Sequence, residues 1–221
     1  MAAGAAAAAV FIGVTPGRAQ GQPELSVTGC VDVEIVFARG TFEAPGVGKV
    51  GEVFTEALRQ RLPGRVVGVH PVRYPASVQF ELAAEGVLDA SNRLRELSAT
   101  CPATEIVLGG YSQGAAVSGY VTSETVPAGY ALTALPAEVA QNVTAVVLFG
   151  KPAPAILTLL RRDAPPISIG SAFADKTLDL CAAGDPVCEP GAFDRGAHSA
   201  YAVNGMADTA AEFVVDRLHR D

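Results

Sequence analysis

Hydrophobic residues along this chain fall into two kinds of pattern, and the two kinds alternate. Short blocks that are apolar at nearly every position are typical of strands buried on both faces of a sheet. Such blocks predict strands over residues 31–38, 65–70, 104–109, 143–149 and 176–181. Stretches with apolar residues at helical spacing predict helices over residues 48–62, 80–97 and 200–218, and a further helix that begins at Gln113.

This alternation of strands and helices predicts an α/β fold, with a parallel sheet that helices cover on both faces. The sequence contains no internal repeat and no linker beyond residue 25, so residues 28–221 are predicted to form a single domain. In folds of this class, ligands bind beyond the carboxyl ends of the strands. The G-x-G-x-x-G fingerprint of dinucleotide-binding proteins does not occur.

Composition and charge narrow the classes of partner. The chain has 221 residues, of which 49% are hydrophobic and 18% charged, and this balance favours a folded protein over a disordered one. The net charge is −7, and no cluster of Lys and Arg is visible. Phosphate backbones and anionic membranes both select clustered positive charge, so we expect neither nucleic acid nor a polybasic membrane contact. A neutral or apolar substrate is expected instead.

The N-terminal region has the features of an export signal. Residues 2–14 form a short apolar block that resembles the hydrophobic region of a signal peptide, and small residues at Gly17 and Ala19 allow cleavage after Ala19. We therefore predict a signal peptide over residues 1–19, a linker over 20–27 and secretion of the remainder. The signal is atypical, because no Lys or Arg precedes the apolar block, unless the true start lies upstream. A disordered Ala-rich tail is the alternative.

The cysteines fit the same expectation. Four cysteines in an exported chain indicate two disulfides, for which three connectivities exist. Sequence proximity favours Cys181–Cys188, which leaves Cys30–Cys101 to join the starts of two strands. No pair has the C-x-x-C spacing of a zinc or redox site. Free buried thiols in a cytosolic protein are the alternative.

The stretch EIVLGGYSQGAAV carries the clearest chemical signal. It places Ser112 between a predicted strand and a predicted helix, with glycines two positions before and two after. This G-x-S-x-G pattern is typical of the nucleophile elbow, in which a tight turn leaves no room for a side chain at either glycine. The alternative is that Ser112 simply caps the helix through its hydroxyl. An N-cap, however, does not need flanking glycines.

A nucleophilic serine needs a base, and hydrolases of this fold order their residues as serine, acid, histidine. Of the three histidines, His70 precedes the serine, and His219 lies where chain ends fray. His198 follows the last predicted strand and immediately precedes the last predicted helix, so we predict it as the base. For the acid we favour Asp185, in the loop that Cys181–Cys188 would close, over Asp194, although Asp185 before proline is also consistent with an ordinary turn.

The oxyanion formed during ester cleavage needs hydrogen-bond donors. The backbone N–H of Gln113 follows the nucleophile at a helix start, where such groups are free. A second donor is expected from ARGTF, in which Gly40 permits an unusual backbone and Thr41 offers both an N–H and a hydroxyl. A routine turn stabilised by the Thr41 hydroxyl is the alternative.

Six motifs together resemble a known family. In chain order they are FARGTFE, VRYPAS, IVLGGYSQGAAV, LFGKP, LCAAGDPVC and GAHSAY. Their order and spacing resemble those of the cutinases, particularly the cutinase-like secreted esterases of actinobacteria, over residues 28–218. The resemblance implies an α/β-hydrolase with a central five-stranded parallel sheet and no cofactor. It also implies the disulfides Cys30–Cys101 and Cys181–Cys188.

The same resemblance implies roles for individual residues. The family's nucleophile falls on Ser112, its acid on Asp185 and its base on His198, and its oxyanion donors fall on Thr41 and Gln113. One departure is the lysine of the LFGKP motif, where relatives often carry an acidic residue; it bears on local loop geometry rather than on catalysis.

The expected activity is that of a secreted serine esterase that hydrolyses carboxylic esters through an acyl-enzyme. The resemblance favours short- to medium-chain acyl esters, with lipids or cutin-type polyesters among the candidates. Acyl transfer to another acceptor, or a catalytically silent binding protein, are the alternatives, and a peptidase is less favoured. We expect a monomer without a transmembrane anchor. Four residues could line an apolar rim for the acyl chain or serve as core or loop anchors: Phe42, Pro186, Val187 and Phe193.

Overall fold

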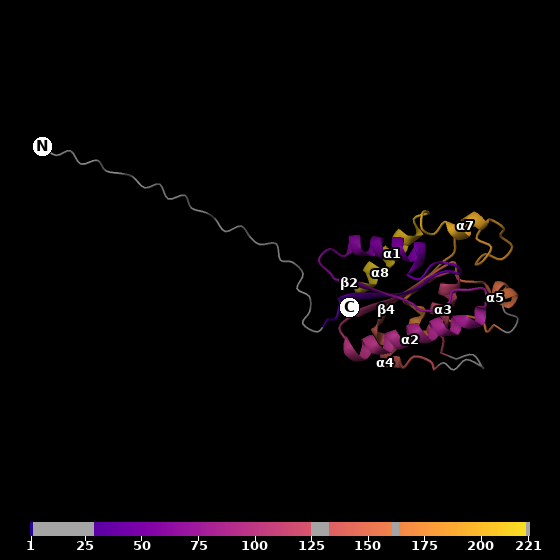
Figure 1. Ribbon diagram of the computed structural model, residues 1–221, viewed down its shortest axis with the longest axis horizontal. Coiled ribbons are helices and arrows are strands. Elements are labelled where there is room, and N and C mark those ends of the chain that lie inside the picture. Colours follow the sequence, from indigo (N-terminus) through magenta and orange to yellow (C-terminus); the bar gives the residue numbers. More distant parts are fainter. Residues whose placement is uncertain (2–28, 125–132, 161–163, 220–221) are drawn as a thin grey trace.

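The computed structural model describes residue 1 and residues 29–124, 133–160 and 164–219 (Figure 1). Apart from Met1, the predicted signal peptide and linker lie outside these residues. Five strands form one parallel sheet in the order β2-β1-β3-β4-β5. The strands are β1 (Val33–Ala38), β2 (Val67–Pro71), β3 (Glu105–Tyr111), β4 (Val143–Phe149) and β5 (Thr177–Leu180). The predicted α/β fold with a five-stranded parallel sheet is confirmed.

Helices cover both faces of the sheet. The helices are α1 (Gly48–Arg61), α2 (Ala83–Thr100), α3 (Gln113–Val121), α4 (Ala137–Asn142), α5 (Pro154–Leu160), α6 (Ser171–Ala174), α7 (Arg195–Ser199) and α8 (Met206–Leu218), with a 3₁₀ turn η1 (Phe80–Leu82) before α2. Helices α1 and α8 lie on one face, and α2, α3 and α4 on the other (Figure 1). This arrangement explains why the central strands have no polar alternation: all six residues of β1 are buried.

Each face has its own hydrophobic core, because successive side chains of a strand point to opposite sides. On β1, Ile35 and Phe37 point toward α1 and α8, whereas Val36 points toward α2 and α3. Phe37 also packs against the rings of Phe54 and Phe149, with centroids 6.1 and 6.3 Å away. The sheet is thereby fixed from both sides, and its carboxyl edge becomes a rigid platform for loops.

The predicted helix over 200–218 is wrong at its start. The chain instead forms the short helix α7, then a turn, and α8 begins only at Met206. Gly205 adopts φ = 85°, a left-handed conformation that glycine tolerates, and the Asn204 side chain accepts a hydrogen bond from the Met206 N–H. The turn at Asn204 and Gly205 therefore delays the start of the last helix to Met206, and His198 lies in the separate short helix α7.

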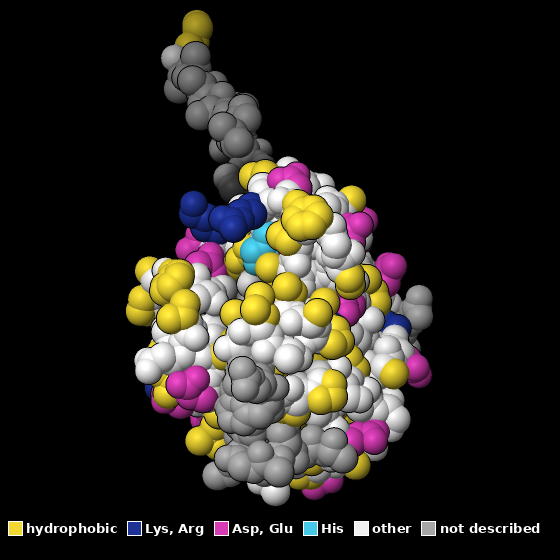
Figure 2. Space-filling view, turned by 90° about the vertical axis from the view of Figure 1, so that its right-hand side faces the viewer, with side chains coloured by type: hydrophobic (Ala, Val, Ile, Leu, Met, Phe, Trp, Pro, Cys, Tyr) yellow, Lys and Arg dark blue, Asp and Glu magenta, His cyan; other side chains and the backbone are white. Residues whose placement is uncertain are grey.

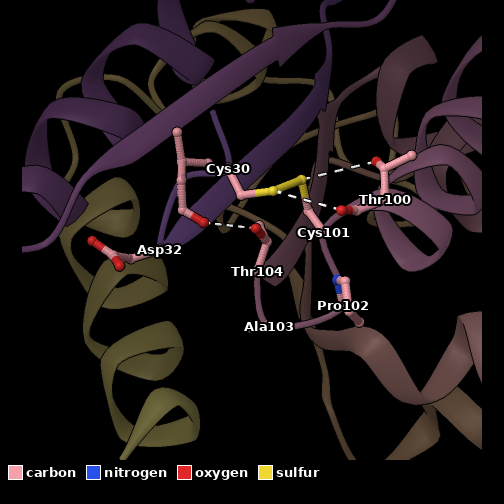
Figure 3. A pocket seen from close by; sticks show the side chains of 8 residues that line it. Cys30, Asp32, Thr100, Cys101, Pro102, Ala103 and Thr104 are labelled. Carbon is pink, nitrogen blue, oxygen red and sulfur yellow. Dashed lines mark hydrogen bonds between the residues drawn. A yellow bond between two sulfur atoms is a disulfide. The ribbon is translucent and has the colours of Figure 1, made fainter. Parts of the chain in front are cut away.

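Both predicted disulfides are present. Cys30–Cys101 joins the segments that precede β1 and β3, which are neighbours in the sheet, and Cys181–Cys188 closes the loop after β5. A pocket of about 260 Å³ surrounds the first disulfide at the amino ends of the strands (Figure 3). Within it, the Thr104 hydroxyl donates to the Val31 carbonyl at 2.6 Å. None of the helices in the described residues is long and apolar enough to cross a membrane.

Candidate active site

The turn between β3 and α3 has the geometry of a nucleophile elbow. Ser112 adopts φ = 55° and ψ = −116°, a backbone conformation that residues with a side chain rarely occupy. A Cβ atom on Gly110 would lie 2.2 Å from the Gly114 carbonyl oxygen, and one on Gly114 would lie 1.9 Å from the Ala38 carbonyl oxygen. The two glycines are required because α3 packs directly against β3 and β1, as the sequence pattern predicted.

The hydroxyl of Ser112 does not cap the helix. Ser112 occupies the N-cap position of α3, but its side chain makes no capping hydrogen bond. Its Oγ lies 2.9 Å from Nε2 of His198 instead. The capping interpretation of this serine is therefore wrong, and the strained turn presents the hydroxyl to an imidazole.

His198 links the serine to a carboxylate. Its Nδ1 lies 2.8 Å from Oδ2 of Asp185. A carboxylate can only accept hydrogen bonds, so Nδ1 carries the proton that this contact uses. In the neutral imidazole, Nε2 then has a free lone pair that accepts from the Ser112 hydroxyl. The three groups form one continuous hydrogen-bonded chain, although they come from three separate segments of the sequence.

Asp185 is fully buried, and its carboxylate is held by several donors. The Val187 N–H donates to Oδ1 at 2.8 Å, and the Tyr201 hydroxyl donates to Oδ2 at 2.6 Å. Asp194, the alternative carboxylate, is occupied elsewhere: it caps α7 by accepting from the Gly196 N–H at 2.8 Å. The structure thus brings Asp185 to His198 and leaves Asp194 in a local structural contact.

The two other histidines lie in different surroundings. His70 is at the end of β2, where its Nε2 lies 2.9 Å from Oδ2 of Asp89 on α2. His219 follows α8 and is exposed. Of the three histidines, His198 is the one whose ring the structure places against Ser112.

The predicted oxyanion residues lie next to each other. The Thr41 hydroxyl is 3.3 Å from Oε1 of Gln113, and Nε2 of Gln113 donates to the Ser77 carbonyl at 2.9 Å. Gln113 is buried and is the first residue of α3, so its backbone N–H has no acceptor within the helix. The side chain of Gln113 therefore ties two loops together, while its backbone N–H belongs to the same turn as Ser112.

The prediction that Gly40 permits an unusual backbone is wrong. Gly40 is not among the residues with a positive φ, so it does not supply an unusual backbone. A Cβ atom there would instead lie 2.7 Å from the ring of Tyr111, the residue before Ser112. The left-handed conformation falls on Phe42, with φ = 65°. Close approach to β3 is thus what requires glycine at position 40.

Two charged residues that sequence reasoning did not single out shape this loop. The guanidinium of Arg39 is buried and donates to the Tyr74 carbonyl at 2.7 Å and to the Glu43 carbonyl at 2.9 Å. The carboxylate of Glu43 accepts from the N–H groups of Gly40 and Lys49, at 2.7 and 2.9 Å. Both lie within the FARGTFE motif, where charged residues beside an apolar strand end were the available signal.

Tyrosines surround the histidine. The Tyr111 ring lies 5.2 Å from the His198 ring, and its hydroxyl donates to the His198 carbonyl at 2.6 Å. The Tyr201 ring meets the imidazole edge-on at 6.3 Å. Burial, together with the charges of Glu43 and Asp185, raises the pKa of Tyr111 to about 12. The residue Tyr201 was not predicted, although it stands in the same GAHSAY motif as His198.

Apolar side chains are exposed near the site. Phe42, two residues from Gly40, is 78% exposed, and Phe193, five residues before His198, is 89% exposed. Figure 2 shows a histidine on this face of the molecule, with hydrophobic side chains on one side of it and Lys or Arg side chains on the other. Phe42 and Phe193 are therefore surface residues and not core anchors, whereas Pro186 and Val187 are half-buried.

Lys151 marks the one departure that the motifs showed. Its Nζ lies 3.2 Å from Oδ2 of Asp179 on β5, so it forms an ion pair at the carboxyl end of the sheet. This pair joins the loop that follows β4 to strand β5, and it involves none of Ser112, His198 and Asp185.

Comparison with known proteins identifies related sequences over most of the chain. The family model Cutinase matches residues 29–218. The probable carboxylesterase Culp5 of Mycobacterium tuberculosis is 45% identical over 174 residues, which cover 77% of this chain and 98% of that protein. The phospholipase Culp4 of the same organism is 42% identical over 214 residues, which cover 97% of this chain and 89% of that protein.

Solved structures give the same result for the fold. A Trichoderma reesei cutinase, solved with a C11Y4 phosphonate inhibitor, is 35% identical with a TM-score of 0.66, over 86% of this chain and 77% of that one. An acetyl xylan esterase is 26% identical with a TM-score of 0.70, over 86% of this chain and 99% of that one.

Proposed function

The chain belongs to the cutinase family and is a carboxylic ester hydrolase, and from this premise we propose that Ser112, His198 and Asp185 are its catalytic triad. The observation that carries the proposal is the continuous hydrogen-bonded chain from the Ser112 hydroxyl through the imidazole to a buried carboxylate, at 2.9 and 2.8 Å. Such an arrangement activates a hydroxyl that would otherwise remain protonated at neutral pH.

The chemistry follows from the positions of the protons. His198 accepts the proton of the Ser112 hydroxyl through Nε2 as the serine oxygen attacks the ester carbonyl. Asp185 keeps the other proton on Nδ1 and stabilises the imidazolium that forms. The imidazolium then protonates the leaving alcohol, and a water molecule repeats the same steps to release the acid from the acyl-enzyme.

The oxyanion of each tetrahedral intermediate is assigned to Gln113 and Thr41. The Gln113 backbone N–H points from the start of α3, where the helix dipole favours negative charge. The Thr41 hydroxyl lies beside the Gln113 side chain and exchanges that contact for the oxyanion when substrate is bound. We expect the loss of either donor to lower kcat more than it raises KM.

The substrate is proposed to be an ester with an apolar acyl chain. Phe42 and Phe193 flank the residues assigned to the oxyanion and the base, and both are exposed. Apolar surface of this kind at the rim of a site stabilises a bound hydrocarbon chain by about 25 cal/mol for each Å² removed from water. Culp1 and Culp5 of mycobacteria are named as carboxylesterases and Culp4 as a phospholipase, and both kinds of substrate carry acyl esters.

Export from the cell is part of the same proposal. Two disulfides require an oxidising compartment, and the sequence begins with an apolar block that fits a signal peptide. We propose that the mature enzyme is a secreted or envelope-associated monomer. N-terminal sequencing of protein recovered from the culture medium and envelope, with light scattering of the purified enzyme, tests both statements.

The deciding experiment measures hydrolysis of p-nitrophenyl esters over a series of acyl lengths. Ser112→Ala is expected to reduce kcat by about four to six orders of magnitude while the protein stays folded. Asp185→Asn is expected to cost about three to four orders, because the imidazole loses its orienting acceptor. Its matched control, Asp194→Asn, removes a carboxylate of the same loop region and should keep activity within about threefold, since its one described role is a helix cap.

Two results would contradict the proposal. Near-normal hydrolysis by Ser112→Ala would remove the nucleophile assignment. A folded and oxidised wild-type protein that cleaves no ester of any chain length, and that an active-site phosphonate does not label at Ser112, would favour a silent binding protein on this scaffold.

A further inference from the structure

Tyr201 contributes a contact to the site that the triad alone does not require. Its ring is fully buried, and its hydroxyl donates to Oδ2 of Asp185 at 2.6 Å. That oxygen is the same one that receives the Nδ1 proton of His198 at 2.8 Å. One carboxylate oxygen therefore carries two donors, one from the imidazole and one from the phenol.

The phenol itself is held on several sides. Its oxygen accepts a hydrogen bond from the Ala182 N–H at 3.0 Å and lies 3.4 Å from Sγ of Cys188. Its ring packs against Phe149 at 6.1 Å and against Tyr111 at 5.8 Å. Tyr201 thus ties the loop that carries Asp185 to the segment that carries His198. The Tyr201 hydroxyl and Nδ1 of His198 both hydrogen-bond to Oδ2 of Asp185.

Tyr201 remains a donor over the whole range in which an esterase works. Burial, and then the hydrogen bond to Asp185, raise the pKa of the Tyr201 phenol above its ordinary value. The phenol consequently keeps its proton in neutral and mildly alkaline solution. The contact with Asp185 is therefore present whatever the protonation of His198.

A glycine protects this contact. Gly150, which follows β4, adopts φ = 59°, and a Cβ atom there would lie 3.0 Å from the Tyr201 hydroxyl oxygen and 3.1 Å from Oδ2 of Asp185. A side chain at this position would press on both partners of the hydrogen bond. The glycine of the LFGKP motif thus leaves space for the hydrogen bond between Tyr201 and Asp185.

We propose that Tyr201 is a positioning residue for the reaction: its hydroxyl fixes Oδ2 of Asp185 and shares that oxygen's negative charge, and so sets both the orientation and the basicity of His198. The proposal rests on the assignment of Asp185 as the acid of the triad. It concerns a residue that acts through Asp185 and does not touch the substrate.

The expected direction of the pH effect follows from the charges near the imidazole. His198 faces Asp185 and Tyr201 on one side and Tyr111 and Ser112 on the other, and Arg195 is an exposed residue of its own helix. The charge of Glu43 acts on Tyr111 from the oxyanion loop. Without the phenol, the full charge of Oδ2 faces the Nδ1 proton, the imidazolium is stabilised, and the base form appears only at higher pH.

The test compares Tyr201→Phe with Tyr111→Phe. Each variant removes one hydroxyl that hydrogen-bonds beside His198, but only Tyr201 touches the carboxylate. For Tyr201→Phe we expect kcat about tenfold lower, KM within about twofold, and the acidic limb of the kcat/KM profile about half a pH unit higher, since hydrogen bonds to a charged group are stronger than those between neutral groups. For Tyr111→Phe the acidic limb stays in place.

A second comparison shows that the effect passes through the acid. In an Asp185→Asn background, assayed with an activated ester at high enzyme concentration, Tyr201→Phe should change kcat by less than about twofold. If Tyr201→Phe lowers kcat equally in both backgrounds, or leaves the limb and kcat at wild-type values, Tyr201 is only a structural residue. If Asp185→Asn alone keeps full activity, the triad assignment fails first, so the two failures are distinguishable.

A further pair of variants applies if Tyr201→Phe does not fold. Gly150→Ala keeps the hydroxyl but places a methyl group against both partners, whereas Gly191→Ala imposes the same left-handed backbone, φ = 84°, with no atom within 4 Å. We expect Gly150→Ala to lower kcat about tenfold with a shifted acidic limb, while Gly191→Ala keeps both within about twofold, because only a close contact with Asp185 and Tyr201 reaches the imidazole. Equal profiles for the two variants would overturn the proposal.

Discussion

The two ends of the sheet each carry a disulfide, and the two bonds serve different purposes. At the amino ends, Cys30–Cys101 spans 71 residues and joins the segments before two neighbouring strands. At the carboxyl ends, Cys181–Cys188 spans only 7 residues and encloses Asp185. The first closes a long loop of the unfolded chain, whereas the second restrains a short loop that holds the Asp185 carboxylate against His198.

The surroundings of the two bonds show the same contrast. Around Cys30–Cys101, backbone and hydroxyl groups pair with each other. Thr104 donates to the Val31 carbonyl (Figure 3), and the Glu105 N–H donates to the Asp32 carbonyl. Around Cys181–Cys188, hydrogen bonds converge on the Asp185 side chain from the imidazole, a phenol and a backbone N–H. The contacts at the amino ends of the strands are structural, whereas those at the carboxyl ends fix the position of the Asp185 carboxylate.

Of the changes that separate the two ends of the sheet, removal of the long disulfide Cys30–Cys101 is expected to lower the free energy of unfolding most. In the chain-entropy model, a closed loop of this length contributes about 4 kcal/mol to the free energy of unfolding. The double variant Cys30→Ala/Cys101→Ala should lose most of that amount in urea denaturation and keep kcat within about twofold at temperatures where it is folded. A folded variant with strongly reduced kcat would contradict the separation of the two ends.

The short disulfide should show the opposite balance. Its loop of 7 residues contributes only about 2 kcal/mol to stability. Activity in Cys181→Ala/Cys188→Ala is nevertheless expected to fall by more than about tenfold, because the loop no longer fixes Asp185 against His198. Parallel measurement of kcat and of the urea midpoint tests this, and unchanged activity in the folded variant would show that the remaining contacts hold Asp185 without the bond.

A smaller effect on the free energy of unfolding is expected in alkaline solution, and it arises from tyrosines near the carboxyl ends of the strands. Burial raises the pKa of Tyr74 and of Tyr201, and the hydrogen bond to Asp185 raises that of Tyr201 further. Above about pH 10, the unfolded chain releases protons that these folded residues retain, so stability declines as the pH rises, by at most about 1.4 kcal/mol per pH unit for each tyrosine.

Urea midpoints of the oxidised protein between pH 8 and pH 11 measure this decline, and Tyr201→Phe is the control. The variant lacks one of the tyrosines whose pKa is raised in the folded protein, so its stability should fall less steeply with pH than that of the wild type. A flat wild-type curve, or equal slopes for both proteins, would show that these phenols ionise alike in the folded and unfolded states.

Much of the fold could be predicted because buried parallel strands leave a simple pattern. The strand predicted over 143–149 has the bounds of β4, and the helix predicted over 48–62 differs from α1 by one residue. The short helices α4, α5, α6 and α7 were not predicted. Segments of four to seven residues carry too few turns for a helical period to stand out, and their ends depend on local contacts.

By itself, the sequence determined the chemistry that is available to this protein. The glycines beside Ser112, the place of His198 after the last predicted strand and the loop between Cys181 and Cys188 are all legible as residue types at given spacings. These patterns indicated a serine hydrolase, because each one meets a local requirement of a turn, a loop or a reaction. The cutinase family was indicated by the resemblance of six ordered motifs.

Only the tertiary structure decided which groups meet. Ser112 and His198 are 86 residues apart in the chain, and the parallel sheet places both at its carboxyl edge. The same packing joined Tyr201 to Asp185, set Gly150 beside them and occupied Asp194 with a helix cap. Such contacts depend on distances between elements, which residue spacing along a chain does not encode.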